Sequence, residues 1–223
     1  MHITGEFESA SYVELTLNAL KRFGVKVERP DDRTFVIKGK QTFENVCEYV
    51  EGDYSNAAFF EAMKRLGHKV SVTGLDAESA QGDRVYSELF DRIEENDLPI
   101  DISDCPDLAP ILFAYSAVKG KGVFTGTRRL AVKESHRALA MKEELAKFGA
   151  EVAVMENSVQ VSCKELTVPS EVLLGHNDHR IVMALAVLCS ITGGIIDGAE
   201  AVAKSFPDFF QRFRSLGIEA CEI

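Results

Sequence analysis

Apolar residues recur at helical spacing in four segments of the chain, and each segment ends in glycine. These segments are residues 15–24, 57–67, 141–149 and 209–217. The spacing predicts amphipathic helices, and glycine adopts the left-handed conformation that commonly ends a helix. A short apolar or alternating run follows each glycine, at residues 25–28, 69–74, 150–154 and 218–220. The pattern therefore predicts a repeated unit in which a helix leads through glycine into a strand.

Two other runs, residues 34–39 and 158–163, alternate with period two, which predicts hairpin strands. The turn-forming residues Glu156 and Asn157 precede the second run. The unit is thus helix, glycine, strand, turn, strand, and its irregular spacing argues against a solenoid. We expect a few copies of one α/β unit, packed with helices inside and sheets outside or in two layers.

A domain boundary is predicted near residues 48–52, where one complete unit ends. A single unit is too small to form a domain of its own. We therefore expect residues 1–49 to be the remnant of a lobe that begins outside this sequence, and residues 50–223 to form the second lobe.

Composition and charge narrow the function. The 223 residues are 46% hydrophobic, which is enough for a core, and carry 25 Lys+Arg against 35 Asp+Glu, a net charge of −10. Nucleic-acid binding needs a basic surface, so we expect no nucleic-acid partner. An anion would need a local cationic pocket in this acidic molecule.

The same sequence predicts a cytoplasmic protein without a membrane partner. No apolar run reaches the roughly 18 residues that span a bilayer, and the first residues lack the features of a signal peptide. Five cysteines, odd in number and without C-x-x-C spacing, are expected to be free thiols in a reducing compartment.

The segment 132–137 is a candidate anion site. Lys133 and Arg137 share a face if this turn is helical, and Glu134 lies near a helix start, where backbone N–H groups attract anions. Phosphate or carboxylate would suit this arrangement. An ordinary exposed helix face is the open alternative.

The segment 175–180 leads into an apolar helix, with Asn177 or Asp178 as its N-cap. His179 and Arg180 then lie in the first turn, where a cation opposes the helix dipole and an anionic ligand would explain it. A metal held by His176 and His179 is the alternative, and a pair at i,i+3 without a third ligand argues against it.

Asp107 follows Pro106 and precedes an apolar helix expected over residues 108–118. It serves either as a helix cap or as an acid or base whose carboxylate faces a cleft. Asp53 lies at a similar junction, where capping and function are both open.

Lys204 precedes the last helix, which we expect to be capped by Ser205 or Asp208 with Pro207 in its first turn. Lys204 would then be free to reach into a site. Helix starts gather at one end of a repeat fold. We therefore expect an anion-attracting surface at that end, built from these junctions.

Taken together, five strings resemble the EPSP synthase family, the 3-phosphoshikimate 1-carboxyvinyltransferases. They are E-G-D-Y-S-N-A-A-F-F at 51–60, D-I-S-D-C-P-D-L-A-P at 101–110, V-K-E-S-H-R at 132–137, H-N-D-H-R-I-V-M-A-L-A at 176–186 and A-K-S-F-P-D-F-F at 203–210. They keep the family's order. The resemblance implies an α+β fold, the inside-out α/β barrel of enolpyruvyl transferases built from repeated βαβαββ units, with one near-complete lobe and a remnant of the other.

The resemblance also implies a reaction. The family transfers the enolpyruvyl group of phosphoenolpyruvate to the 5-hydroxyl of shikimate 3-phosphate and releases phosphate, a step of aromatic amino acid biosynthesis, with no metal or organic cofactor. Carried over by position, the resemblance implies that Asp107 is the acid/base residue and that Glu134 makes a second proton transfer. It implies phosphoenolpyruvate binding by Arg137, Arg180 and Lys204. It also implies shikimate 3-phosphate binding by Lys133, His179, Ser9 and Tyr12, with Asp53 as a further substrate-binding residue.

The chain departs from the family in several respects, among them a short passage between Leu89 and Asp101. The family string usually reads L-R-V-K-E-S-D-R, where this chain has Ala131 and His136, and Arg128 and Arg129 are the candidates to replace the lost charge. The family's N-terminal region, with its own substrate-binding Lys and Arg, has no counterpart. We expect half of such a clamp to bind weakly and turn over poorly or not at all.

Two alternatives follow. The chain could be a non-catalytic anion-binding or complementation module that pairs with the missing N-terminal lobe. It could also be a relative of the enolpyruvyl transferase that acts on UDP-N-acetylglucosamine, although that family shares the fold without this combination of K-E-S-x-R and N-D-H-R.

Overall fold

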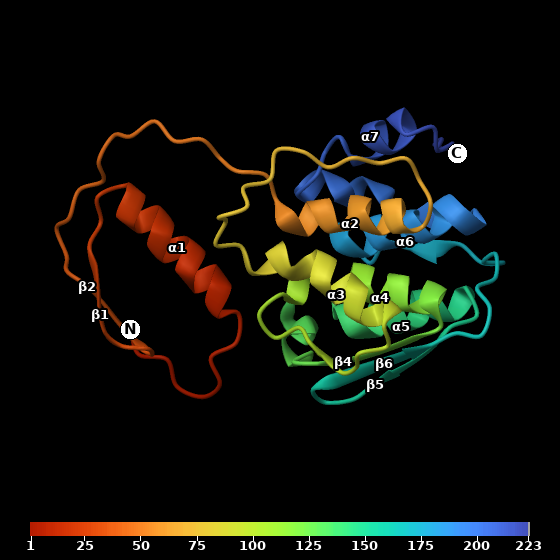
Figure 1. The fold of residues 1–223 in the computed structure, drawn as a ribbon, viewed down its shortest axis with the longest axis horizontal. Coiled ribbons are helices and arrows are strands. Elements are labelled where there is room, and N and C mark those ends of the chain that lie inside the picture. The colour runs from red at the N-terminus through yellow and green to blue at the C-terminus, as the bar shows by residue number, and fades with distance from the viewer. Residues whose placement is uncertain (223) are drawn as a thin grey trace.

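The computed structural model describes residues 1–222, and its elements fall into a small N-terminal group and a larger body (Figure 1). The small group consists of helix α1 (Ala10–Arg22) and the antiparallel hairpin of β1 (Val27–Asp31) and β2 (Thr34–Ile37). Phe35 is buried in this group, where its ring meets Phe7 edge-on. The hairpin confirms the strands predicted on both sides of residues 30–33.

The larger body contains six α-helices and six strands within the described residues. The helices are α2 (Tyr54–Arg65), α3 (Tyr86–Glu94), α4 (Ala109–Lys119), α5 (Arg137–Lys147), α6 (His179–Thr192) and α7 (Phe209–Ser215). Strands β3 (Ile100–Asp101), β4 (Lys121–Thr125), β5 (Glu151–Val154) and β6 (Ser158–Ser162) form one sheet in the order β3-β4-β6-β5, and β7 (Leu173–Leu174) pairs in parallel with β8 (Ile196–Asp197). Short 3-10 helices cover Gly82–Val85, Pro106–Leu108, Arg128–Val132 and Ala199–Lys204.

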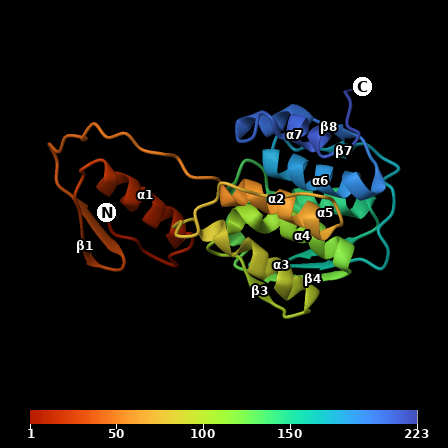
Figure 2. The same ribbon diagram turned by 45° about the horizontal axis from the view of Figure 1, so that its top comes forward.

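Helices α4 and α6 form the centre of the body and pack against each other. Residues 109–117 of α4 and 179–188 of α6 are all buried. The four-stranded sheet lies outside them on one side (Figures 1 and 2). A helix that is apolar on every face belongs in a core, so this arrangement confirms the prediction of helices inside and sheet outside.

Two of the four predicted helix–glycine–strand units are confirmed. Gly24 and Gly149 adopt positive φ and lead from α1 into β1 and from α5 into β5. The strands predicted at residues 69–74 and 218–220 are wrong, because neither segment pairs with another strand in the part of the chain that the structure describes. Their apolar side chains still pack on the core. An alternating pattern fixes which side chains face the core, but a strand also needs a hydrogen-bonded neighbour.

The small group and the body are joined by residues 38–53, which carry no helix or strand. Among the described residues, the main core contains none of the first 53. The two parts meet at a few polar contacts, including Ser11 with Asp104 and Glu6 with Arg128. The boundary predicted near residues 48–52 falls in the connecting segment and stays a prediction.

Within residues 1–222, no helix combines the length and the apolar character needed to cross a bilayer.

Candidate functional site

The side chain of Arg137 is the centre of a buried ion-pair cluster at the helix starts. Its guanidinium is 1% exposed and donates to three carboxylates. The Nε atom lies 2.9 Å from Asp178, Nη1 lies 2.6 Å from Asp107, and Nη2 lies 2.7 Å from Glu134. One arginine therefore joins three segments that the sequence had singled out separately.

Asp107 is surrounded by three cations. Besides Arg137, its oxygens form ion pairs with Lys133 Nζ at 3.1 Å and with Arg180 Nη2 at 3.0 Å. Burial by itself would raise the pKa of the Asp107 carboxyl, but the charges of Arg180, Arg137 and Lys133 outweigh it and hold that pKa well below its usual range. Asp107 is therefore an ionised carboxylate in a cationic cage.

The start of α6 explains how Arg180 reaches this cage. Asp178 is the N-cap of α6, one of the two predicted caps, and accepts from the backbone N–H of Arg180 at 2.9 Å. His179 and Arg180 occupy the first turn, as predicted. The carboxylates of Asp178 and Asp107 offset the unfavourable placement of a cation at a helix N-terminus. Asp107 itself does not cap α4, so its carboxylate is free for the cluster.

Lys133 and Arg137 do not share a helical turn, which corrects the expected i,i+4 arrangement. Helix α5 begins only at Arg137, and Lys133 has extended backbone angles. The two cations meet because both bind the same oxygen, Oδ1, of Asp107. His136, which replaces the family's aspartate, is the N-cap of α5 and accepts from Leu139 N–H through Nδ1 at 3.3 Å.

Arg180 retains unused donors. Its Nε and Nη1 atoms are buried and have no partner among the described residues, and the same is true of His179 Nδ1. Burial, and then the charge of Arg180, lower the pKa of the His179 imidazole. Unpaired buried donors are costly, so a bound anion would stabilise the arrangement.

A groove of about 420 Å³ lies between α1 and the β1–β2 hairpin, and Arg129 and Lys133 line it from the body. Its lining includes three residues predicted to bind substrate, Ser9, Tyr12 and Lys133, together with Arg129. Ser9 Oγ is buried without a partner in the described part of the chain. Arg128 pairs with Glu6, whereas Arg129 forms no ion pair within residues 1–222. Arg129 is thus the better placed of the two candidates to replace the family's missing arginine.

Lys204 reaches the loop before α6 rather than the cage itself. Its Nζ lies 2.5 Å from the carbonyl oxygen of Asn177 and 2.7 Å from Oδ1 of the same residue, which directly precedes Asp178. The capping expected for the last helix is partly wrong. Asp208 takes the N-cap position without a side-chain capping bond, and Pro207 precedes it instead of lying in the first turn.

Asp53 lies apart from the cluster by its contacts. Its carboxylate caps α2, accepting from the backbone N–H groups of Ser55 at 2.8 Å and Asn56 at 3.3 Å. It lines a second hollow, of about 540 Å³, between α2, residues 70–75 and the segment leading into α7. The capping alternative accounts for everything that the structure shows of Asp53.

Asp83 is a buried acid beside the site that sequence reasoning missed. Its Oδ2 accepts from the hydroxyls of Tyr12, at 3.3 Å, and Ser55, whereas its Oδ1 has no partner within residues 1–222. Burial raises the pKa of this carboxyl to about 6. Asp83 lies in the short 3-10 helix Gly82–Val85, a segment with no apolar periodicity, so no sequence pattern distinguished it.

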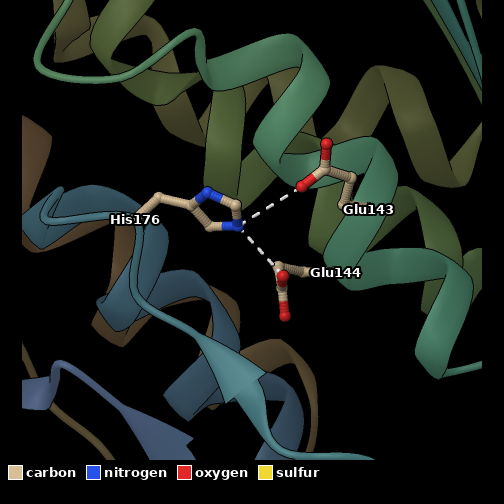
Figure 3. A group of neighbouring side chains, drawn as sticks. All are labelled: Glu143, Glu144 and His176. Atoms are coloured by element: carbon tan, nitrogen blue, oxygen red, sulfur yellow. Dashed lines mark hydrogen bonds and ion pairs between the residues drawn. The ribbon is translucent and has the colours of Figure 1, made fainter.

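The two histidines considered as a metal pair point to different surroundings. His176 Nε2 lies 2.9 Å from Glu144 and 3.9 Å from Glu143, on α5 (Figure 3). Glu144 already binds Lys147 Nζ at 2.8 Å and Leu174 N–H at 2.8 Å. These bonds neutralise its charge and fasten the loop before α6 to α5, which accounts for the grouping of these three residues without an ion.

Comparisons with known proteins show the family of the chain. The family model of EPSP synthase (3-phosphoshikimate 1-carboxyvinyltransferase) matches residues 1–213. A 3-phosphoshikimate 1-carboxyvinyltransferase of Clostridium kluyveri is 41% identical over 100% of this chain and 56% of its own length. One from Clostridioides difficile is 35% identical over 96% of this chain and 54% of its own length. The chain thus spans about half the length of the curated relatives it matches.

Two solved structures share the fold. EPSP synthase from Acinetobacter baumannii superposes with a TM-score of 0.61 at 23% identity, over 91% of this chain and 54% of its own. The enolpyruvyl transferase NikO from Streptomyces tendae gives 0.62 at 16% identity, over 93% and 53%. These likenesses bear out the inside-out α/β fold. With the family model matching nearly its whole length, the chain belongs to the EPSP synthase family.

Proposed function

We propose that this chain supplies one side of an active site that transfers the enolpyruvyl group of phosphoenolpyruvate to the 5-hydroxyl of shikimate 3-phosphate. The observation that carries the proposal is the convergence of Lys133, Arg137 and Arg180 on Asp107. Two buried donors of Arg180 have no hydrogen-bond partner in the described part of the chain. Both substrates carry phosphate and carboxylate groups, which such a cluster can hold.

Asp107 takes the role of the acid/base residue. In the free protein the surrounding cations lower its pKa, which makes it a weak base. Anionic substrates that bind Arg137, Arg180 and Lys133 would draw these charges away from Asp107. Its pKa would then rise toward the range in which it accepts the proton of a hydroxyl.

Glu134 takes the second proton transfer. Its side chain is 42% exposed while bound to Arg137 Nη2, so it can be reached from solvent or by a substrate carbon. Arg137, Arg180 and Lys204 hold phosphoenolpyruvate, and Lys133, Ser9 and Tyr12 face shikimate 3-phosphate across the groove. Such clamps act by positioning and by electrostatics in a water-excluded site.

Phosphate release from phosphoenolpyruvate and shikimate 3-phosphate tests the proposal. The assay is run on the chain alone and on the chain mixed with the N-terminal portion of a full-length relative. We expect little turnover alone and restored turnover in the mixture. No turnover in a mixture whose two parts demonstrably associate would overturn the proposal.

Asp107→Asn in the reconstituted enzyme tests the acid/base assignment. We expect kcat to fall by roughly 100-fold or more, because general acid–base groups contribute about this much, while both substrates still bind. Asp208→Asn is the matched control, since that carboxylate pairs only with Arg212 on the surface. Unchanged kcat in Asp107→Asn would show that another group moves the proton.

A non-catalytic role is the second candidate. In that case the cluster binds anions and pairs with a separate lobe without turnover. Calorimetry with each substrate separates the two, since binding without turnover in the mixture identifies the module. UDP-N-acetylglucosamine in place of shikimate 3-phosphate tests the remaining alternative acceptor.

A further inference from the structure

Asp83 forms a buried polar link between the N-terminal group and the body. Asp83 is 4% exposed, yet within residues 1–222 only one of its carboxylate oxygens accepts a hydrogen bond. That oxygen receives the Tyr12 hydroxyl of α1 at 3.3 Å and the Ser55 hydroxyl of α2. A buried carboxylate with one unpaired oxygen is costly in a structure, so its presence beside the site calls for a function.

Tyr12 lies between Asp83 and the groove. Its ring lines the groove, and the Lys133 ammonium lies 5.6 Å from the ring centroid. A phenol has a single proton to donate. The hydroxyl donates to Asp83 at 3.3 Å and also faces the Asp107 carboxylate. With its proton directed at these carboxylates, the oxygen of Tyr12 has only lone pairs left for a ligand. Lys133, which lines the groove from the body, provides the positive charge.

We infer that Asp83 is a positioning residue, which by holding the Tyr12 proton makes Tyr12 an acceptor for a ligand hydroxyl beside the phosphate-binding Lys133. The inference rests on the proposed function and adds a rule of selection to it. A ligand that carries a hydroxyl next to its anionic group satisfies both Tyr12 and Lys133. A plain anion satisfies only Lys133 and its cationic neighbours.

A first experiment tests the Asp83–Tyr12 link without any ligand. Tyrosines labelled with ¹³C at Cζ are followed by NMR from pH 4.5 to 7.5, and Tyr12→Phe identifies the Tyr12 signal among the five tyrosines. We expect an inflection near pH 6 that Asp83→Asn abolishes. Ser55→Ala should move the inflection upward, because the Ser55 hydrogen bond lowers the pKa of Asp83.

Other charges around Asp83 are accounted for. Asp107 and Arg180 act on it from neighbouring elements, and the lowered pKa of Asp107 keeps that carboxylate ionised throughout this pH range. His179 adjoins Arg180 and can titrate within the range, and an inflection that survives in Asp83→Asn would belong to it. Such a surviving inflection, or a flat Tyr12 signal in the unaltered chain, would overturn the inference.

A second experiment measures ligand selection by calorimetry with shikimate 3-phosphate and with inorganic phosphate. We expect Asp83→Asn and Tyr12→Phe each to lower the affinity for shikimate 3-phosphate by roughly fivefold, which corresponds to the loss of one hydrogen bond. The affinity for phosphate should not change. The double variant should be no weaker than either single one. Asp208→Asn is the control and should match the unaltered chain with both ligands.

The selection rule would be overturned if the affinity for both ligands fell equally. It would also be overturned if the losses of affinity in the two single variants added up in the double variant. If the mixture with the N-terminal portion of a full-length relative bound neither ligand, the proposed function would fail, and the NMR titration would still decide whether Asp83 holds the Tyr12 proton. Tyr12→Phe loses only a hydroxyl on a half-buried ring, so it provides the test even if Asp83→Asn folds poorly.

Discussion

Residue by residue, the cluster around Arg137 concentrates charge where water is excluded. Arg137 and Asp178 are buried almost completely, and Asp107 is 14% exposed. A buried charge is tolerated only while its partners and hydrogen bonds are complete. The energetic effects of substitution here should therefore be far larger than those at surface ion pairs.

Arg137→Leu should lower the free energy of unfolding by about 3–5 kcal/mol, because it leaves Asp107 and Asp178 buried with fewer partners. Urea denaturation followed by circular dichroism measures the change. Arg128→Leu is the control, since Arg128 is 49% exposed where it pairs with Glu6 and should cost less than about 1 kcal/mol. Similar losses in the two variants would contradict the assignment of Arg137 as the centre of the cluster.

Asp83 should make the protein less stable as pH rises. Burial raises the pKa of its carboxyl from 3.8 to about 6, so the folded chain binds this proton more tightly than the unfolded chain. The stability contributed by that proton is present below the unfolded value and is lost as pH rises through the folded pKa. The loss is on the order of 3 kcal/mol.

Asp83→Asn removes this titration. Denaturation curves at pH 4.5, 6 and 7.5 should show that the free energy of unfolding of the variant rises relative to that of the unaltered chain as pH rises. Comparing the two proteins at each pH cancels the contributions of Asp107 and Asp178, whose lowered pKa values act at more acidic pH. A constant difference across the three pH values would argue that Asp83 is ionised throughout.

Among the elements, helix starts place the functional groups. The caps of α5 and α6 orient Arg137 and Arg180 toward the residue that precedes α4, so three helices meet at Asp107. The apolar character of these segments predicted the helices from the sequence, since α4 and α6 are buried in the core. Their exact starts were less predictable, since the turn at residues 133–136 follows the demands of the cluster and not a helical period.

His136→Asp should stabilise α5. An aspartate is a better N-cap than an imidazole whose Nδ1 accepts at 3.3 Å, and its charge also favours the helix N-terminus. We expect a gain of about 0.5–1 kcal/mol in the free energy of unfolding at pH 7. Thermal denaturation measures it, with His136→Ala as the comparison that removes the cap. A lower stability for His136→Asp than for His136→Ala would contradict this capping role.

For the whole molecule, the separate packing of the N-terminal group matters most. The main core begins at Tyr54, and the first 49 residues touch the body mainly through polar contacts. We propose on this basis that residues 50–223 fold as one lobe. The groove, in contrast, takes residues from both parts, because α1 and the hairpin form most of its lining and Arg129 and Lys133 of the body complete it.

A chain restricted to residues 50–223 should therefore keep a cooperative unfolding transition while losing affinity for shikimate 3-phosphate. Differential scanning calorimetry and ligand titration measure the two properties on the same sample. The full 223-residue chain is the reference. Loss of the cooperative transition would place the first 49 residues in the folding unit and contradict the predicted boundary.

The sequence by itself determined the family, the central helices and most members of the cluster. Motif spacing and apolar periodicity are local properties, so residues such as Asp107, Arg137 and Arg180 could be selected without coordinates. The same reasoning selected Asp53, and only its contacts in the structure show that it caps a helix and is not a member of the cluster.

The tertiary structure decided which groups share an atom and which segments find partners. It joined Lys133 and Arg137 through one oxygen of Asp107, and it placed Asp83 against Tyr12, 71 positions away in the chain. It also left residues 69–74 without a strand to pair with. Ion pairs and β-ladders depend on distances between remote segments, which neither periodicity nor residue type contains.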